Sequence, residues 1–327
     1  MQSLELLHPR DLAGASAGHR DTDAFIAGGT DLLQLMKYNV VAPARLIDLD
    51  ALGLSEIAFG GGVLRLGARA TMADVAGHAE VRARFPAIAQ ALHLSASPQI
   101  RNMGTMAGNL LQRTRCNYFR DTGFACNKRN PGSGCPAQHG DNRHLAILGG
   151  SDACIATHPS DMPVALVAFD AQVEIVSADR QTRSVALEDF YRLPGDTPQV
   201  ETVLQPGDVI TAILVPEQAA ARHATYLKLR DRTSFAFALV SAAVGLHIEG
   251  GVIGDARVAL GGVAPRPWRL PQVEAALRGH RAERAVFAAA ADLAGEGAVG
   301  RGENDFKIEL ARRAVLRALQ TVAGDMQ

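Results

Sequence analysis

The 327-residue chain contains four cysteines, and three of them lie in one stretch that is rich in glycine and proline. Cys116, Cys126 and Cys135 fall close together, and Cys154 follows after eighteen intervening residues. Glycine permits left-handed backbone and proline fixes one dihedral angle, so we expect this stretch to wind irregularly. If the four thiols belong to one site, the fold must gather them, because they are not adjacent in the sequence.

Four kinds of structure could account for these thiols. A 4Fe-4S cluster requires four thiolate ligands, and the chain has four cysteines with none left over. A structural zinc site also uses four cysteines, but usually as C-x2-C pairs, and here nine, eight and eighteen residues separate them. Two disulfides would pair all four residues, and four unrelated buried thiols would need no common structure. The residues by themselves are compatible with each of the four.

The surroundings of the cysteines are positively charged, although the whole chain is not. Residues 101–143 contain seven basic and two acidic side chains, whereas the complete chain has 33 basic and 34 acidic residues. A net charge of -1 argues against a dedicated nucleic-acid-binding protein. The local excess would offset the negative charge of a thiolate-ligated cluster.

Three other segments are typical of loops that hold a phosphate-bearing ligand. "FIAGGTDLL", which starts at Phe25, joins a strand-like run to paired glycines, whose amides can converge on an anion. "IRNMGTMAGNLL", from Ile100, combines two glycines with hydrogen-bonding Thr105 and Asn109. "THPSDMP", from Thr157, places Ser160 and Asp161 on a proline-bounded loop. Ordinary turns and helix caps use the same residue types, so each segment alone has a structural explanation.

The remaining pattern predicts an α+β fold with two or three domains. We expect strands at 45–50 and in a hairpin at 55–68, then two helices at 71–96 separated near Pro86. Further strands are expected at 163–178, 208–216, 224–230, 235–249 and 256–265, before a helical tail at 270–322. A boundary is expected at 216–221.

These motifs together resemble a known family, the flavin-binding subunits of the xanthine dehydrogenase-type molybdenum hydroxylases. The resemblance runs through "AGGTDLL", "IRNMGTMAGNL", "ATHPSDMPVALVAFDA" and "VALGGVAPRPWR" and covers essentially the whole chain. It implies that FAD is bound by the loop of Phe25, Ile26, Ala27, Gly28, Gly29, Thr30, Asp31 and Leu32, by Gly104, Thr105, Gly108 and Asn109, and by Ser160 and Asp161. Lys228 corresponds to a basic or polar position near the flavin ring, and its alternative is a solvated strand lysine.

The resemblance also implies an architecture. A two-lobed FAD-binding domain of the vanillyl-alcohol-oxidase type is expected at 1–217, with lobes at about 1–54 and 55–217. A C-terminal α+β domain with a three-stranded antiparallel sheet and helices is expected at 218–327.

Ordinary flavin subunits of the family lack the segment from about 112 to 154, which we call the insert. A subgroup that resembles periplasmic-type aldehyde oxidoreductases carries such a segment with a 4Fe-4S cluster. The resemblance therefore implies that Cys116, Cys126, Cys135 and Cys154 are the cluster ligands. His139, His144 and His158 lie in the same region but are not needed, because four thiolates complete the set.

The sequence contains no convincing nucleophile, carboxylate pair or molybdenum-binding signature, so we expect no catalytic residue in this chain. By resemblance, it is the electron-transfer subunit of a heterotrimeric aldehyde oxidoreductase. A large molybdopterin-binding subunit would oxidise the substrate, and a small subunit with 2Fe-2S centres would pass electrons to FAD and an external acceptor. We take a redox role for the added cluster as the hypothesis; bracing the insert is the other possibility.

Two other functions stay open at this point. One is the flavin subunit of a 4-hydroxybenzoyl-CoA reductase-like enzyme, which also carries an added cluster. The other is a zinc-binding nucleic-acid module built on the basic insert. The chain shows no signal peptide or membrane-spanning run, so we expect no membrane span. Its location would be cytoplasmic, or periplasmic through export with a signal-bearing partner.

Overall fold

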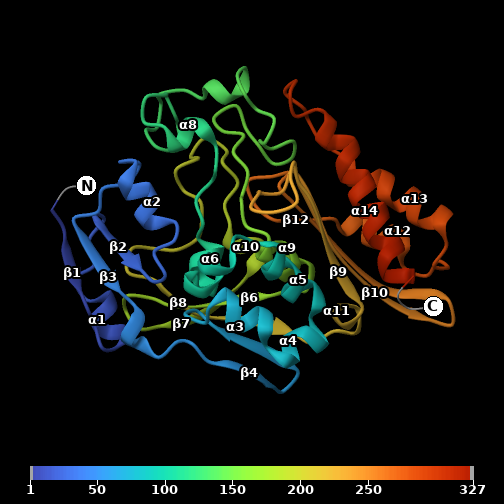
Figure 1. Ribbon diagram of the computed structural model, residues 1–327, viewed down its shortest axis with the longest axis horizontal. Coiled ribbons are helices and arrows are strands. Elements are labelled where there is room, and N and C mark those ends of the chain that lie inside the picture. The colour runs from blue at the N-terminus through green and yellow to red at the C-terminus, as the bar shows by residue number, and fades with distance from the viewer. Residues whose placement is uncertain (1–2, 325–327) are drawn as a thin grey trace.

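A computed structural model describes residues 3–324, which form three sheets with helices packed against them (Figure 1). The first sheet is small and parallel, in the order β1 (Glu5–Leu7), β3 (Arg45–Asp48) and β2 (Asp23–Ile26). It is accompanied by α1 (Leu12–Ser16), α2 (Leu32–Lys37) and the short turn η1 (Asp50–Leu52). The chain leaves β2 through paired glycines and enters α2, so the first glycine-rich segment forms a strand-to-helix turn.

The second sheet is antiparallel and carries the largest apolar core. Its strand order is β4 (Ile57–Gly60), β5 (Val63–Gly67), β8 (Val209–Pro216), β6 (Gln172–Val176) and β7 (Thr182–Ala186). Its part of the chain also contains α3 (Met72–Gly77), α4 (Ala79–Arg84), α5 (Pro86–Leu94), α6 (Pro98–Met103), α7 (Met106–Leu110), α9 (Met162–Ala168) and α10 (Leu187–Phe190). The predicted hairpin is confirmed as β4 and β5.

The third sheet forms the C-terminal part of the fold. Its order is β12 (Trp268–Arg269), β11 (Val252–Gly261), β10 (Val240–Glu249) and β9 (Ala224–Leu229), all antiparallel. The helices of this part are α11 (Ala219–Arg222), α12 (Pro271–Leu277), α13 (Arg284–Asp292), η3 (Leu293–Gly295) and α14 (Phe306–Gly324). Helix α14 packs on β9 and β10 through residues spaced three and four apart, including Ala311, Val315 and Leu319.

The structure confirms an α+β fold and corrects three expectations. The C-terminal sheet has four strands rather than three, because Trp268 and Arg269 pair with Leu260 and Ala259. The segment 71–96 contains three helices rather than two. The first half of the expected strand at 163–178 is helix α9. That helix is buried on all sides, so its apolar run carries no period, and Pro163 stands at the start where helices tolerate proline.

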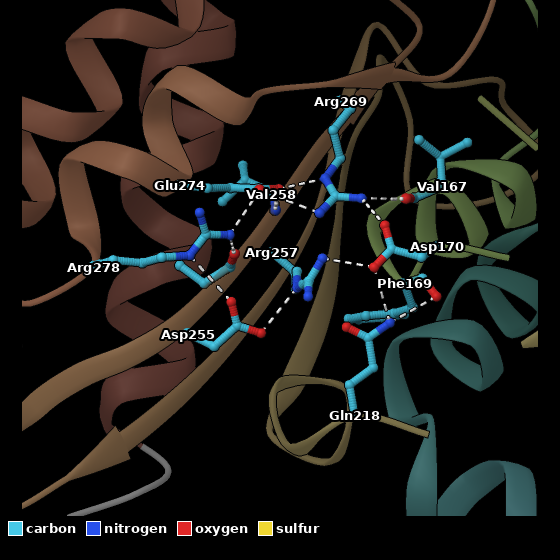
Figure 2. A network of polar contacts seen from close by, with 11 residues as sticks. Val167, Phe169, Asp170, Gln218, Asp255, Arg257, Val258, Arg269, Glu274 and Arg278 are labelled. Carbon is cyan, nitrogen blue, oxygen red and sulfur yellow. Dashed lines mark hydrogen bonds and ion pairs between the residues drawn. The ribbon is translucent and has the colours of Figure 1, made fainter. Parts of the chain in front are cut away.

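The C-terminal sheet is tied to the second sheet's domain by a network of charged side chains (Figure 2). Asp170, which follows α9, accepts hydrogen bonds from Arg257 at 2.7 Å and from Arg269 at 2.6 Å. Arg269 also contacts the buried Glu274 on α12. The network fixes the relative placement of the two parts.

The insert lies at the top of the view in Figure 1 and contains two short helical turns, α8 (Asn117–Arg120) and η2 (Pro136–Gln138). It has a small apolar core of its own, which includes Phe119 and Leu145 together with three of the cysteines. Leu35 and Val40, from α2 and the residues after it, belong to the same core. Among residues 3–324, no helix has the length and apolar character needed to cross a membrane.

Candidate cofactor site

A cavity of about 1000 Å³, which we call the main cavity, brings together the three predicted loops and strand β9. Seven predicted cofactor residues line it: Thr30, Gly104, Gly108, Asn109, Ser160, Asp161 and Lys228. The other predicted residues do not line it. Strand β2 ends with Phe25 and Ile26, and the turn that follows contains Ala27, Gly28 and Gly29. Helix α2 then begins at Leu32. The side chains of Asp31 and Thr105 are hydrogen-bonded to other parts of the protein.

Two of the loops meet backbone to backbone. A Cβ atom on Gly28 would lie 1.8 Å from the carbonyl oxygen of Met103, so only glycine permits this approach. Gly29 has φ +68°, a left-handed conformation that glycine adopts without strain. The first glycine-rich turn is thus held directly against the second, and both border the cavity.

The second loop is fixed by a helix cap. Thr105 precedes α7 and its Oγ accepts a hydrogen bond from the amide of Gly108 at 3.2 Å. The buried Asn109 side chain accepts a hydrogen bond from the Ser160 hydroxyl, which joins this loop to the third. The second and third loops therefore present a preorganised polar wall to the cavity.

The third loop is organised around the buried carboxylate of Asp161. It accepts hydrogen bonds from Ser95 at 2.9 Å, from the Tyr226 hydroxyl at 2.7 Å and from the Lys228 ammonium at 2.7 Å. The Lys228 side chain is only 2 % exposed, so the alternative of a solvated strand lysine is wrong. Burial, and then the charge of Asp161, raise the pKa of Tyr226, which is a neutral donor at physiological pH.

Sequence reasoning missed His158, which supports the third loop from behind. Its ring lies between the carbonyl oxygen of Leu110, 3.2 Å from Nε2, and the amide of Ser160, 3.4 Å from Nδ1. Burial lowers the pKa of His158 to about 4, so its ring is neutral and Nδ1 can accept the amide hydrogen. No local motif marks this role, because its partners come from two different loops.

Four aromatic side chains at the edge of the cavity were also missed. Tyr38, Phe124, Phe235 and Phe237 line it and are exposed. They come from the end of α2, from the insert and from the loop between β9 and β10. Their shared location depends on tertiary structure, so no sequence pattern could have grouped them.

All four cysteines lie around one small cavity within the insert, and none of them forms a disulfide. Three are buried and Cys135 is partly exposed. Backbone amides of residues 118 and 119 point to Cys116, and the amide of Ala156 lies 3.5 Å from the Cys154 sulfur. Amide hydrogens directed at sulfur stabilise thiolate ligands of iron–sulfur clusters. The donor set and its surroundings therefore fit such a cluster.

Burial opposes the ionisation of three of the cysteines. Burial raises the pKa of Cys116 to about 12, and it also raises the pKa of Cys135 and of Cys154. The buried Lys128 ammonium opposes this effect at Cys154. These thiols would need a strongly positive group nearby, such as a metal ion, in order to deprotonate.

The four thiols surround their cavity instead of converging on one point. Within residues 3–324, no group of three or more His, Cys, Asp or Glu side chains is arranged to hold a single metal ion. A zinc ion requires its sulfur ligands about 2.3 Å from one centre. An iron–sulfur cluster is a larger group, and its ligands stand further apart.

Most basic side chains of the insert face acidic groups from other segments instead of the cysteines. Asp31 contacts Arg115 and accepts a hydrogen bond from Arg120 at 2.8 Å. Glu201 contacts Arg113 and lies 2.9 Å from Lys128, and Asp231 lies 2.7 Å from Arg143. The local positive charge thus largely anchors the insert, and Lys128 is the cation that also acts on a cysteine.

Another cavity, of about 240 Å³, lies beside the insert. It is lined by Cys116 together with Ser160 and Asp161. The latter two also line the main cavity, so one cysteine lies next to the predicted flavin site.

Comparison with known proteins identifies two family domains in the chain. The model of the family described as FAD binding domain in molybdopterin dehydrogenase matches residues 2–218. The family described as CO dehydrogenase flavoprotein C-terminal domain matches residues 224–322.

Full-length relatives and solved structures agree with these matches. The aldehyde oxidoreductase FAD-binding subunit PaoB of Escherichia coli is 48 % identical over 296 residues, which is 90 % of each chain. The carbon monoxide dehydrogenase medium chain of Hydrogenophaga pseudoflava is 28 % identical and is covered over 92 % of its length. The structure of carbon monoxide dehydrogenase from that organism superimposes with a TM-score of 0.76 at 27 % identity, over 99 % of this chain and 98 % of the other. Quinoline 2-oxidoreductase from Pseudomonas putida gives 0.77 at 26 % identity, over 100 % and 99 %.

Proposed function

The chain belongs to the family of FAD-binding medium subunits of the molybdenum hydroxylases, and from this premise we propose that it is the flavin subunit of an aldehyde oxidoreductase with a 4Fe-4S cluster in its insert. The observation that carries the proposal is the 48 % identity to a subunit named for that activity, over 90 % of both chains. The gathering of four unpaired cysteines in the insert supports the cluster.

FAD would occupy the main cavity. The turn from Phe25 to Leu32 and the loop containing Gly104, Thr105, Gly108 and Asn109 would offer backbone amides and a side-chain amide to its diphosphate. Ser160, Asp161 and Lys228 would contact other parts of the cofactor. The bound flavin supplies the ability to accept electrons singly and release them as a pair.

The protein's own residues would hold and orient this cofactor. Asp161 holds the Lys228 side chain in place, and His158 holds the Ser160 amide. The exposed aromatic side chains would restrict water at the mouth of the cavity. Each contribution is binding and positioning, and we propose no catalytic residue in this chain.

We propose a redox role for the cluster, because Cys116 lies beside a cavity that it shares with Ser160 and Asp161. Electrons would arrive from 2Fe-2S centres of a small subunit after a large molybdopterin-binding subunit oxidises the aldehyde. An external acceptor would remove them. The medium chains among the relatives support this assembly. We set aside the zinc-binding nucleic-acid module for two reasons. The two family models account for most of the chain, and basic side chains of the insert are paired with acidic residues of other segments of the same protein.

The proposal is tested on the complex purified with its partner subunits under anaerobic conditions. We expect about one FAD per copy of this chain. After the iron and sulfide of the small subunit are subtracted, about four iron and four acid-labile sulfide should remain per copy. Potentiometry during aldehyde oxidation should show the cluster cycling between two oxidation states. Zinc in place of iron would refute the cluster. A cluster that stays in one oxidation state during turnover would refute its redox role.

A further inference from the structure

We propose that Asp31 is a positioning residue that couples FAD binding to assembly of the cluster in the insert. This inference rests on the proposed function, because it requires both cofactors. Asp31 belongs to the first glycine-rich turn, directly after Thr30, which lines the main cavity. Its side chain, however, contacts the insert.

The orientation of the Asp31 side chain is unusual for its place in the chain. It precedes α2, where an aspartate commonly caps the helix through its carboxylate, yet it makes no such bond. Its carboxylate instead accepts hydrogen bonds from the amide of Arg113 at 2.9 Å and from the Arg120 guanidinium at 2.8 Å. It also contacts the Arg115 guanidinium. Three donors from residues 113–120 therefore converge on one carboxylate of the flavin loop.

These donors control the backbone on both sides of the first cysteine. Arg115 directly precedes Cys116, and Arg120 ends the helical turn α8 that follows it. The Arg120 guanidinium also donates to the carbonyl oxygens of Thr114 at 2.9 Å and Arg113 at 3.0 Å. Through Arg120, Asp31 thus fixes the backbone that leads to Cys116.

The helix after Asp31 makes a second connection in the same direction. The Asp31 carbonyl oxygen accepts the amide hydrogen of Leu35 at 3.1 Å. Leu35 is 2 % exposed and packs in the same apolar core as three of the cysteines. A ligand that orders the turn at Thr30 therefore orders both the carboxylate and the apolar side chain on which the insert depends.

Coupling of this kind is reciprocal, because two ligands that favour one arrangement strengthen each other's binding equally. In the wild-type complex, removing the cluster with a chelator under anaerobic conditions should weaken FAD binding by roughly 10-fold. FAD should in turn slow the loss of iron to the chelator. We define the coupling ratio as the FAD dissociation constant without the cluster divided by the constant with the cluster. In Asp31→Ala this ratio should be close to one.

The experiment titrates FAD into deflavinated complex, with and without the cluster, and follows flavin fluorescence. Glu174→Ala is the matched control, since Glu174 is a paired carboxylate of the second sheet that binds Arg65 at 2.8 and 3.0 Å and does not contact the insert. It should keep the wild-type ratio even if it lowers stability. Asp31→Asn retains an oxygen for the Arg113 amide but loses the charge, and it should give an intermediate ratio.

Each outcome decides the proposal. A ratio near one in the wild type, or a wild-type ratio in Asp31→Ala, overturns the coupling while FAD and iron in the same samples leave the proposed function intact. If the wild-type complex is found to contain no extra iron, or no FAD, the proposed function itself is overturned. The proposed coupling is then overturned as well. A loss of the ratio in Glu174→Ala would show that general destabilisation, not Asp31, governs it.

Discussion

The flavin loops and the cysteine insert border one another, but different forces hold them. The flavin loops are shaped by backbone: Gly28 lies against the Met103 carbonyl, and Thr105 caps a short helix. The insert is anchored by side chains that pair across long sequence separations, such as Lys128 with Glu201. A backbone-built site can tolerate change in most side chains around it, whereas an insert anchored by a few charged pairs depends on each of them.

The largest expected effect is in the insert. Cys126→Ser replaces a buried proposed ligand by a hydroxyl that binds iron weakly, and the segment has little other core to stabilise it. We expect the extra iron to fall to roughly a tenth or less of the wild-type content, and proteolysis to begin within 112–154. Iron analysis and mass mapping of the fragments measure both.

The same variant tests whether the two regions differ as described. With FAD in large excess over its dissociation constant, Cys126→Ser should still bind flavin, because the glycine turns do not require the cluster for their shape. Complete loss of flavin at saturating concentration would contradict the distinction between a backbone-built site and a thiol-built insert.

The second effect is in the flavin loop. Gly28→Ala places a methyl group 1.8 Å from the Met103 carbonyl oxygen, so one of the two loops must move. We expect FAD affinity to fall by roughly 100-fold, equivalent to about 2.7 kcal/mol, with a smaller loss of iron. Gly60→Ala is the control, since a Cβ there has no neighbour within 4 Å. Equal FAD affinity in both variants would show that the close approach is unimportant.

These differences explain what the sequence could predict. The glycine turns were recognisable because their function depends on residues adjacent in the chain, and seven predicted residues line the main cavity. The four cysteines line one small cavity, which agrees with the common site that the family resemblance implied for them. The roles of Asp31, Glu201 and His158 were not predictable, since their partners lie tens of residues away.

The errors in the fold have a similar cause. Helix α9 was mistaken for a strand because a fully buried helix shows no polar face in its sequence. Strand β12 has two residues and exists only because β11 offers an edge, so no local pattern could indicate it. The positive charge of the insert was visible, but its pairing with other segments depends on tertiary structure.

A third, smaller effect should follow from Glu201→Gln. The Lys128 ammonium, whose side chain is 7 % exposed, would keep the Pro198 carbonyl at 2.6 Å but lose its carboxylate. Leaving a buried charge without its partner is destabilising, and partial exposure of Glu201 reduces the loss to about 2 kcal/mol. Chemical unfolding measures it. Asp231→Asn, which breaks the exposed pair with Arg143, should cost less than about 1 kcal/mol. Equal losses in the two variants would place the anchoring outside the buried pair.

A further effect, which appears only as the pH rises, concerns the contact between the insert and the C-terminal helices. Lys307 on α14 is fully buried, and its ammonium donates to the carbonyl oxygens of Leu145 at 2.8 Å and Gly262 at 2.5 Å. Burial lowers the pKa of Lys307 from 10.5 to about 7. Above pH 7 the unfolded chain therefore binds a proton that the folded chain releases.

Stability rises with pH wherever the unfolded state binds more protons than the folded state. Above pH 7, this lysine should therefore increase the free energy of unfolding by at most about 1.4 kcal/mol per pH unit, and below pH 6 it should cause no change with pH. Lys307→Met removes the titration. The free energy of unfolding of the wild type minus that of the variant should thus increase from pH 7 to pH 9 in denaturant titrations. A constant difference would mean that the ammonium stays charged in the fold, and that the carbonyl oxygens of the insert and of the C-terminal sheet stabilise it enough to offset its burial.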